Sequence, residues 1–214
     1  MSMRLGVLGG MFDPVHKGHI EAAYLAQKML GLDAVHLVPC HIPNHREAAL
    51  GSAVERLEML QRAVSGYTGL AVNPVELNRT QVSYTVDTLV EIRRQLRPDV
   101  LVLVTGMDSF NGLPGWHEWR KLFGLCHFFV LARNGETVSS DTAAKLELDT
   151  RRVDSADAMY AVDTGKIWIV ENFSVDISST KVRKAIQKQQ DLTRLLDKKV
   201  IEYIYHNRLY GAAE

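Results

Sequence analysis

The apolar residues of the chain fall into two patterns that take turns along its length. Short apolar runs predict strands that are buried in a sheet, and the run 100–104 is unbroken. These runs span residues 4–8, 34–38, 70–75, 100–104, 127–131 and 167–170. Between the first and second runs, between the third and fourth, and after the last one, apolar residues recur every three or four positions, as on the buried face of a helix. Alternation of the two patterns is typical of α/β proteins.

The N-terminal part of the chain predicts a strand, a helix and a second strand, in that order. Gly9 and Gly10 end the first apolar run, and Gly31 follows the helix as a C-terminal cap would. The apolar positions of that helix are Ala22, Leu25, Ala26 and Met29. Such a βαβ unit has two parallel strands joined by a right-handed crossover.

The whole chain predicts a Rossmann-like, doubly wound α/β fold. We expect a parallel sheet of about five or six strands with helices on both faces, and a ligand beyond the carboxyl ends of the strands. We interpret residues 1–214 as a single domain. Within it, the polar stretch 134–165 predicts a surface excursion with some helix around 143–148, rather than a functional lid. Residues 178–214 predict a C-terminal helical part.

The charge balance and the cysteine content exclude several classes of protein. Lysine and arginine total 25, as do aspartate and glutamate, so the formal net charge is zero. A protein that coats nucleic acid usually has a basic excess, so nucleic acid is not an expected partner. No window approaches the ~18 apolar residues of a membrane span, and no signal-peptide core is present. Cys40 and Cys126 are too few for a disulfide framework or a thiolate metal site.

These exclusions leave a protein of the cytoplasm that handles something small. Neither a membrane nor a nucleic acid is expected as a partner, and the sequence leaves homo-oligomerisation open.

The segment that carries most chemistry is G-G-M-F-D-P-V-H-K-G-H, residues 9–19, directly after the first predicted strand. It is neither the dinucleotide-binding fingerprint G-x-G-x-x-G nor a P-loop. Paired glycines let a ligand approach the backbone closely, because they carry no Cβ. Asp13 and Pro14 predict a turn before the helix.

Two histidines of this segment, His16 and His19, are three residues apart and therefore share one face of the first helical turn. Imidazoles beside the free N–H groups of a helix N-terminus form a phosphate site that needs no metal. One alternative is that the two histidines only pack, and another is a zinc site, in which His36, His41 or His45 would supply a third ligand. We favour the phosphate site, because the glycines of the segment serve phosphate approach and have no part in coordinating zinc.

Five motifs, in order along the chain, resemble those of a known superfamily. The H-x-G-H core preceded by G-G-x-F-D-P, together with I-S-S-T-K-V-R at 177–183, is similar to the superfamily that transfers a nucleoside monophosphate from a triphosphate. The remaining motifs resemble the bacterial nicotinate-nucleotide adenylyltransferases. They are S-Y-T-x-D-T-L at 83–89, G-x-D at 106–108 and L-P-x-W-x-x-W at 113–119.

The resemblance implies a single nucleotidyltransferase domain that serves NAD biosynthesis. Its reaction would be adenylyl transfer from ATP to nicotinate mononucleotide, giving nicotinate adenine dinucleotide and pyrophosphate. The phosphate of the mononucleotide would attack the α-phosphorus of ATP in line, so catalysis reduces to positioning and charge neutralisation. A Mg²⁺ ion that bridges the ATP phosphates is expected, with little ligation by the protein.

The resemblance also implies the site residues. The catalytic residues would be His16, His19 and Arg183. The residues implied to bind ATP are Gly9, Gly10, Met11, Phe12, His16, His19, Gly106, Asp108, Arg133, Ile177, Ser178, Ser179, Thr180 and Arg183. The residues implied to bind the mononucleotide are Tyr84, Thr85, Trp116, His45 and Arg46.

Elementary chemistry agrees with several of these roles. Asp108 follows a central strand, on the ligand side of the sheet, where it would bind a ribose hydroxyl of adenosine. Arg133 is similarly placed, although a surface salt bridge would explain it equally well. Trp116 offers the flat apolar partner that a pyridine ring needs, whereas Trp119 is assigned to the core. Thr85 begins a predicted helix, whose N-terminus favours an anion and hence nicotinate over nicotinamide.

The chain departs from the family pattern at two positions. Met11 stands where a threonine or serine is usual, and Asn44 interrupts the family's P-P-H-[KR] loop. Three alternatives stay open beside the main interpretation. The first is another adenylyltransferase or cytidylyltransferase of the superfamily, acting on nicotinamide mononucleotide or phosphopantetheine. The second is a nucleotide sensor without catalysis. The third, a nicotinamide-dependent dehydrogenase, is disfavoured by the missing G-x-G-x-x-G.

Overall fold

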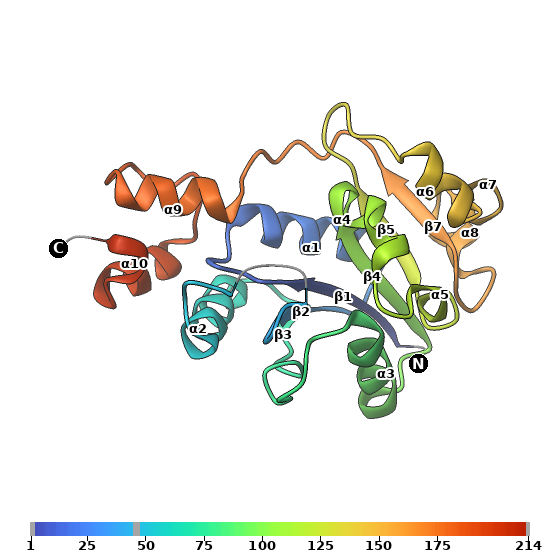
Figure 1. Cartoon of the computed structure of the whole chain (residues 1–214), viewed down its shortest axis with the longest axis horizontal. Helices are drawn as coiled ribbons and strands as arrows, with labels where there is room; N and C mark the ends of the chain where they lie inside the picture. Colours follow the sequence, from blue (N-terminus) through green and yellow to red (C-terminus); the bar gives the residue numbers. More distant parts are fainter. Residues whose placement is uncertain (1–2, 45–47, 213–214) are drawn as a thin grey trace.

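The computed structural model describes residues 3–44 and 48–212 (Figure 1). Within these residues, parallel strands form one seven-stranded sheet in the order β3-β2-β1-β4-β5-β7-β6. The strands are β1 (Arg4–Gly10), β2 (Ala34–Pro39), β3 (Leu70–Val72), β4 (Val100–Gly106), β5 (His127–Leu131), β6 (Arg152–Val153) and β7 (Ile167–Val170). The doubly wound α/β fold is therefore confirmed, with one strand more than predicted.

The extra strand is β6, which pairs with β7 at one edge of the sheet. It contains only two residues, too few for an apolar run to reveal it. At the other edge, β3 ends at Val72 rather than at Val75, because Asn73 and Pro74 follow it. The order of the strands reverses at β1 and β4, the position at which α/β sheets bind ligands.

Ten helices and two short 3₁₀ turns are formed by the described residues. The helices are α1 (Lys17–Leu30), α2 (Ala53–Val64), α3 (Thr85–Leu96), α4 (Met107–Asn111), α5 (Trp119–Leu122), α6 (Ser140–Lys145), α7 (Leu148–Arg151), α8 (Ala156–Tyr160), α9 (Ser179–Gln187) and α10 (Lys198–His206). The 3₁₀ turns are η1 (Leu113–Gly115) and η2 (Leu209–Gly211). Gly31 caps α1 in the left-handed conformation, with φ of 58°, as predicted.

The core has two parts, one on each face of the sheet. Successive residues of β4 alternate between them: Leu101 and Leu103 face one part, and Val102 and Val104 the other. The first part is covered by α3, α4 and α5, and the second by α1, α2, α9 and α10. This two-sided burial explains why the strands appear in the sequence as mainly apolar runs, and the central strand β4 as an unbroken one over residues 100–104.

Two segments lie outside the regular alternation. The stretch 134–165 holds α6, α7, β6 and α8, and the helix expected around 143–148 is divided between α6 and α7. After β7, an extended connection runs back along the molecule to α9, so that the C-terminal part lies beside α1 and α2 (Figure 1). No described helix is long and apolar enough to span a membrane.

Candidate active site

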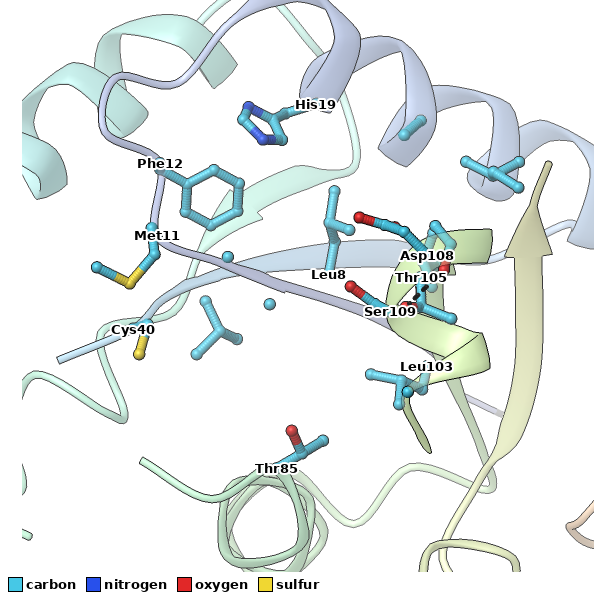
Figure 2. Close-up of a pocket in the computed structure, with 18 of the residues that line it drawn as sticks. Leu8, Met11, Phe12, His19, Cys40, Thr85, Leu103, Thr105, Asp108 and Ser109 are labelled. Atoms are coloured by element: carbon cyan, nitrogen blue, oxygen red, sulfur yellow. Dashed lines mark hydrogen bonds between the residues drawn. The ribbon is translucent and has the colours of Figure 1, made fainter. Parts of the chain in front are cut away.

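A cavity of about 830 Å³ opens where β1, β2, β4 and β5 end. Figure 2 shows His19 and Thr85 on opposite sides of this edge of the sheet, with β1 between them. The cavity is therefore a continuous space from the N-terminus of α1 on one face to the N-terminus of α3 on the other. Its position is the one that the fold predicts for a ligand.

Most of the predicted site residues line this cavity. They are Gly9, Gly10, Met11, Phe12, His16, His19, Tyr84, Thr85, Gly106, Asp108, Trp116, Arg133, Ile177, Ser178, Ser179 and Thr180. Arg183 is not among the lining residues, and His45 and Arg46 lie outside the described residues. Trp119 packs against Phe123, with ring centres 6.2 Å apart, and does not line the cavity.

The histidine pair forms the cavity wall at the start of α1. His16 is the N-cap residue and His19 the third residue of the helix. Their rings are stacked with centroids 3.6 Å apart, and the backbone N–H of His16 donates to Nδ1 of His19 over 3.2 Å. The Phe12 ring meets His19 edge-on at 4.9 Å. These contacts fix the positions of both rings.

Burial keeps both imidazoles neutral. It lowers the pKa of His16 to about 4, with a smaller contribution from the positive charge of Arg133. The pKa of His19 also lies well below its usual value, because of burial first and then His16 and Arg133. At this end of the cavity, the Arg133 side chain and the N-terminus of α1 lie beside neutral imidazoles, an arrangement that favours a phosphate group.

The low pKa of His16 makes the stability of the fold depend on pH. An unfolded histidine takes up a proton near pH 6.5 and the folded His16 only near 4, so the unfolded state binds more protons between these values. We therefore expect the free energy of unfolding to fall as the pH is lowered through this window, and to be insensitive to His16 above it. Urea unfolding at about pH 7 and about pH 5 measures the loss.

Variant His16→Asn isolates this contribution. Between the two pH values, this variant should lose less stability than the unmodified protein, because it lacks the His16 imidazole. The other titrating groups, His127 among them, are present in both proteins. Equal losses in the two proteins would contradict the assignment of a depressed pKa to His16.

The N-terminus of α9 faces the turn that carries the histidines. Ser178 caps α9 by accepting a hydrogen bond from the N–H of Lys181 at 3.2 Å. The Ser179 hydroxyl donates to the carbonyl of Pro14 at 3.0 Å, so it holds the turn. Ser178, Ser179 and Thr180 nevertheless line the cavity, which places the start of a second helix beside the same space.

Two cations of this region point away from the cavity in this structure. Arg183 donates from Nη1 to the backbone carbonyl of Asp13 at 2.6 Å, and the same nitrogen is 3.8 Å from Oδ2 of Asp13. Lys17 donates from Nζ to the carbonyl of Thr193 at 2.6 Å. Arg183 thus binds the turn before α1, and Lys17 binds the loop between α9 and α10. Helical spacing alone does not reveal these contacts.

On the other side of the sheet, aromatic and polar side chains surround the start of α3. Tyr84 and His117 lie 4.2 Å apart between ring centres, and Trp116 is half-buried beside them. Thr85 is the first residue of α3, as predicted. The N-cap residue, Tyr84, makes no side-chain hydrogen bond to the helix, so it leaves the first N–H groups of α3 without a side-chain acceptor.

Sequence reasoning missed a buried polar group on this side. Glu76 is 7% exposed, lines the cavity and accepts a hydrogen bond from the Thr88 hydroxyl at 2.7 Å. Arg79 donates to the same hydroxyl, so a cation stands beside the buried carboxylate. Cys40, which also lines the cavity, has its pKa raised to about 11, mainly by burial, and stays a thiol. Glu76 follows β3 at the ligand-binding edge, a position that would have indicated it.

Asp108 lies at the end of β4, in the first turn of α4. Its carboxylate passes so close to Gly106 that a Cβ at this position would be 2.9 Å from Oδ1. Glycine at 106 therefore allows Asp108 to reach over the end of the strand. Figure 2 shows Asp108 and Ser109 at one end of the cavity and Met11 at the other.

A zinc site finds no support in the described residues. No group of three or more histidine, cysteine, aspartate or glutamate side chains is placed there to hold a metal ion. His36 contacts the amide of Asn73 at 3.2 Å, and His41 the carbonyl of Arg79 at 2.6 Å. His45, the remaining candidate ligand, is outside the described part of the chain.

Comparison with known proteins agrees with the geometry of the site. Residues 7–185 match the model of the cytidylyltransferase-like family. The probable nicotinate-nucleotide adenylyltransferase of Shewanella frigidimarina is 36% identical over 210 residues, covering 97% of this chain and 100% of that protein. The one from Shewanella sediminis is 38% identical over 210 residues, with 98% and 99% covered.

The fold has close counterparts among solved structures. Plasmodium falciparum nicotinic acid mononucleotide adenylyltransferase, complexed with NaAD, superposes with a TM-score of 0.76 at 16% identity, covering 99% of this chain and 98% of that one. This likeness supports the fold, and the sequence matches support the family. The chain belongs to the cytidylyltransferase-like family and, within it, to the nicotinate-nucleotide adenylyltransferases.

Proposed function

We propose that the protein transfers the adenylyl group of ATP to nicotinate mononucleotide, releasing pyrophosphate and forming nicotinate adenine dinucleotide. The observation that carries this proposal is the continuous cavity, which has a histidine pair at one helix N-terminus and an aromatic wall at another. The curated relatives that match over their full length are named for the same reaction. Such an enzyme would serve NAD biosynthesis.

The reaction needs no nucleophile from the protein. A phosphate oxygen of the mononucleotide, already an anion at neutral pH, forms a bond to the α-phosphorus of ATP. The bond from that phosphorus to the bridging oxygen breaks, and its electron pair leaves with pyrophosphate. The site must therefore hold two anions in line and stabilise the charge that shifts between them.

His16, His19 and the start of α9 are proposed to hold the triphosphate. Nδ1 of His19 accepts the His16 backbone N–H, so the neutral ring carries its proton on Nε2 and can donate it to a phosphate oxygen. Gly9 lines the cavity, and a Cβ there would meet nothing within 4 Å, so the space beside its backbone is open to the ligand. Ser178, Ser179 and Thr180 add the N-terminus of α9.

The remaining ATP-binding roles are proposed for residues at the ends of β4 and β5. Asp108 would accept hydrogen bonds from ribose hydroxyls, with Gly106 giving it room. Arg133 would face the nucleotide, because its charge already acts on both histidines. Arg183 is proposed as a phosphate contact that first has to leave the carbonyl of Asp13.

The acceptor is proposed to bind on the α3 side. Trp116 would stack on the pyridine ring, and the first N–H groups of α3, at Thr85, would bind its carboxylate. Tyr84 contributes to the same wall. His45 and Arg46 keep their assignment near the nucleotide phosphates from the resemblance alone.

Nucleotidyltransferases that use ATP generally require a divalent cation. Since no described group of side chains is placed to hold one, the ion is proposed to arrive on the ATP phosphates, as Mg²⁺ does. The MgATP complex is then the substrate, and the protein acts on its phosphate oxygens and not on the ion.

The test supplies ATP, Mg²⁺ and one acceptor phosphate at a time, and measures dinucleotide and pyrophosphate together. We expect equal amounts of nicotinate adenine dinucleotide and pyrophosphate with nicotinate mononucleotide. Turnover only with phosphopantetheine, or turnover that appears only when CTP replaces ATP in a parallel assay, would move the protein to another activity of the superfamily. Binding of ATP without any pyrophosphate release would instead support a nucleotide sensor.

A further inference from the structure

The carboxylate of Asp13 connects three parts of the chain: the turn before α1, the segment before α2 and the C-terminal part. It is 6% exposed and lies in the turn between Phe12 and His16. Its Oδ2 accepts the backbone N–H of Leu50 at 2.8 Å, and its Oδ1 that of Gly51 at 2.9 Å. The Tyr210 hydroxyl, almost 200 residues away in sequence, donates to Oδ1 at 2.8 Å.

The C-terminal part holds this turn at several further points. Arg183 binds the carbonyl of Asp13, and Ser179 that of Pro14. The backbone N–H of Lys17, the first residue of α1, donates to the carbonyl of Leu195 at 2.9 Å. Contacts from residues 179–210 therefore hold the turn that leads to both histidines, together with those from residues 50–56.

The backbone conformation of Tyr210 and the groups around its hydroxyl hold this side chain in place. Its φ of 57° lies in the left-handed region, which a residue with a Cβ rarely adopts unless the surroundings hold it there. Burial and the neighbouring Asp13 raise its pKa well above the usual range, so the hydroxyl stays protonated and donates. At Gly51, a Cβ would be 2.8 Å from the Tyr210 oxygen and 3.2 Å from Oδ1 of Asp13. A side chain there would push the two apart.

A buried arginine of α2 also binds the segments that meet at Asp13. Arg56 is 2% exposed and donates from Nη1 to the carbonyl of Met11 at 2.8 Å and from Nε to that of Gly51 at 3.3 Å. Asp13 therefore has cations on two sides, Arg56 and Arg183, and its carboxylate position depends on the balance of its hydrogen bonds.

We propose that Tyr210 is a positioning residue for the transfer reaction: through Asp13, its hydroxyl sets where the turn places His16 and His19 for the triphosphate. The proposal rests on the proposed function. Tyr210 does not line the cavity and so would not touch either substrate. Without its hydroxyl, we expect the carboxylate to move towards Arg183, now 3.8 Å from Oδ2, and to shift the turn with it.

The test compares Tyr210→Phe with Tyr205→Phe. Both substitutions remove one hydroxyl from the C-terminal part, but the Tyr205 hydroxyl makes no hydrogen bond with the described residues. In Tyr210→Phe, we expect KM for ATP and the Kd of inorganic tripolyphosphate to rise about 10-fold each, because a displaced turn would lose about one hydrogen bond from the histidines to the phosphates. We expect kcat to fall as well, because the same turn places His19, and we expect Tyr205→Phe to match the unmodified protein in all three values.

The Tm from thermal unfolding distinguishes a positioning role of Tyr210 from a contribution to stability alone. A lower Tm with unchanged KM for ATP and unchanged tripolyphosphate affinity would overturn the proposal, because a partly unfolded sample lowers apparent kcat and not affinity. Tripolyphosphate binding requires no acceptor, so this readout is independent of the reaction. If the unmodified protein forms no dinucleotide, the proposed function fails. Equal tripolyphosphate affinity in Tyr210→Phe and in the unmodified protein overturns the role of Tyr210.

A second variant tests the route through Asp13. If Tyr210 acts only through this carboxylate, Tyr210→Phe should weaken tripolyphosphate binding no further when Asp13→Asn is already present. Effects of the two substitutions that multiply, each at its full size, would show that they act independently and would overturn the proposed connection.

Discussion

Replacing His19 by alanine is expected to lower kcat by about 100-fold or more, the effect of removing a donor that stabilises transition-state charge. The His19 ring lines the cavity, is held between Phe12 and His16, and has Nε2–H as the donor left for a phosphate oxygen. The loss should be in kcat more than in KM for ATP, because the charge on the α-phosphoryl group shifts most in the transition state.

The two functions of the His19 side chain can be separated. Besides facing the cavity, it accepts the His16 backbone N–H at the start of α1. Variant His19→Asn retains a side-chain acceptor for that N–H but has no imidazole, so it should fold normally and still lose most of the turnover. Variant His206→Ala, at an exposed histidine near the C-terminus, serves as the control. Turnover within about threefold of normal in both His19 variants would remove this residue from the mechanism.

The parts of the structure that follow from local sequence were predictable. Apolar runs identified each strand longer than two residues, and the turn after β1 was identified by its glycines and histidines. Helix α2 was not predicted, although its start carries a readable signal. Ser52 and Glu55 form a capping box, in which each side chain accepts the other residue's backbone N–H.

The directions of long side chains were not predictable, because distant residues decide them. Helical spacing leaves Arg183 free to point at phosphates, but the carbonyl of Asp13, 170 residues earlier in the chain, holds its guanidinium. The contact of Tyr210 with Asp13 spans an even longer separation, of 197 residues. Neither pair has a sequence signature, since hydrogen bonds to a carbonyl or to a single carboxylate require no particular spacing.

The second large effect expected is a preference for the acid over the amide of the acceptor. We expect kcat/KM for nicotinate mononucleotide to exceed that for nicotinamide mononucleotide by about 100-fold. The first N–H groups of α3 have no side-chain acceptor from the N-cap residue, so they can bind a carboxylate, which the helix N-terminus also favours. The buried carboxylate of Glu76 opposes this preference, but Arg79 binds the same Thr88 hydroxyl and offsets its charge.

Two substitutions at Thr85 test whether the backbone of α3 carries this preference. Thr85→Pro removes the N–H at the first helical position, where proline fits a helix, and Tyr84 already has the extended conformation that a following proline requires. We expect it to reduce the preference to about 10-fold, through loss of a hydrogen bond to the carboxylate. Thr85→Val retains the N–H and should keep the preference. Steady-state kinetics with both acceptors decide the matter: equal use of acid and amide by the unmodified protein would show that α3 does not bind the carboxylate.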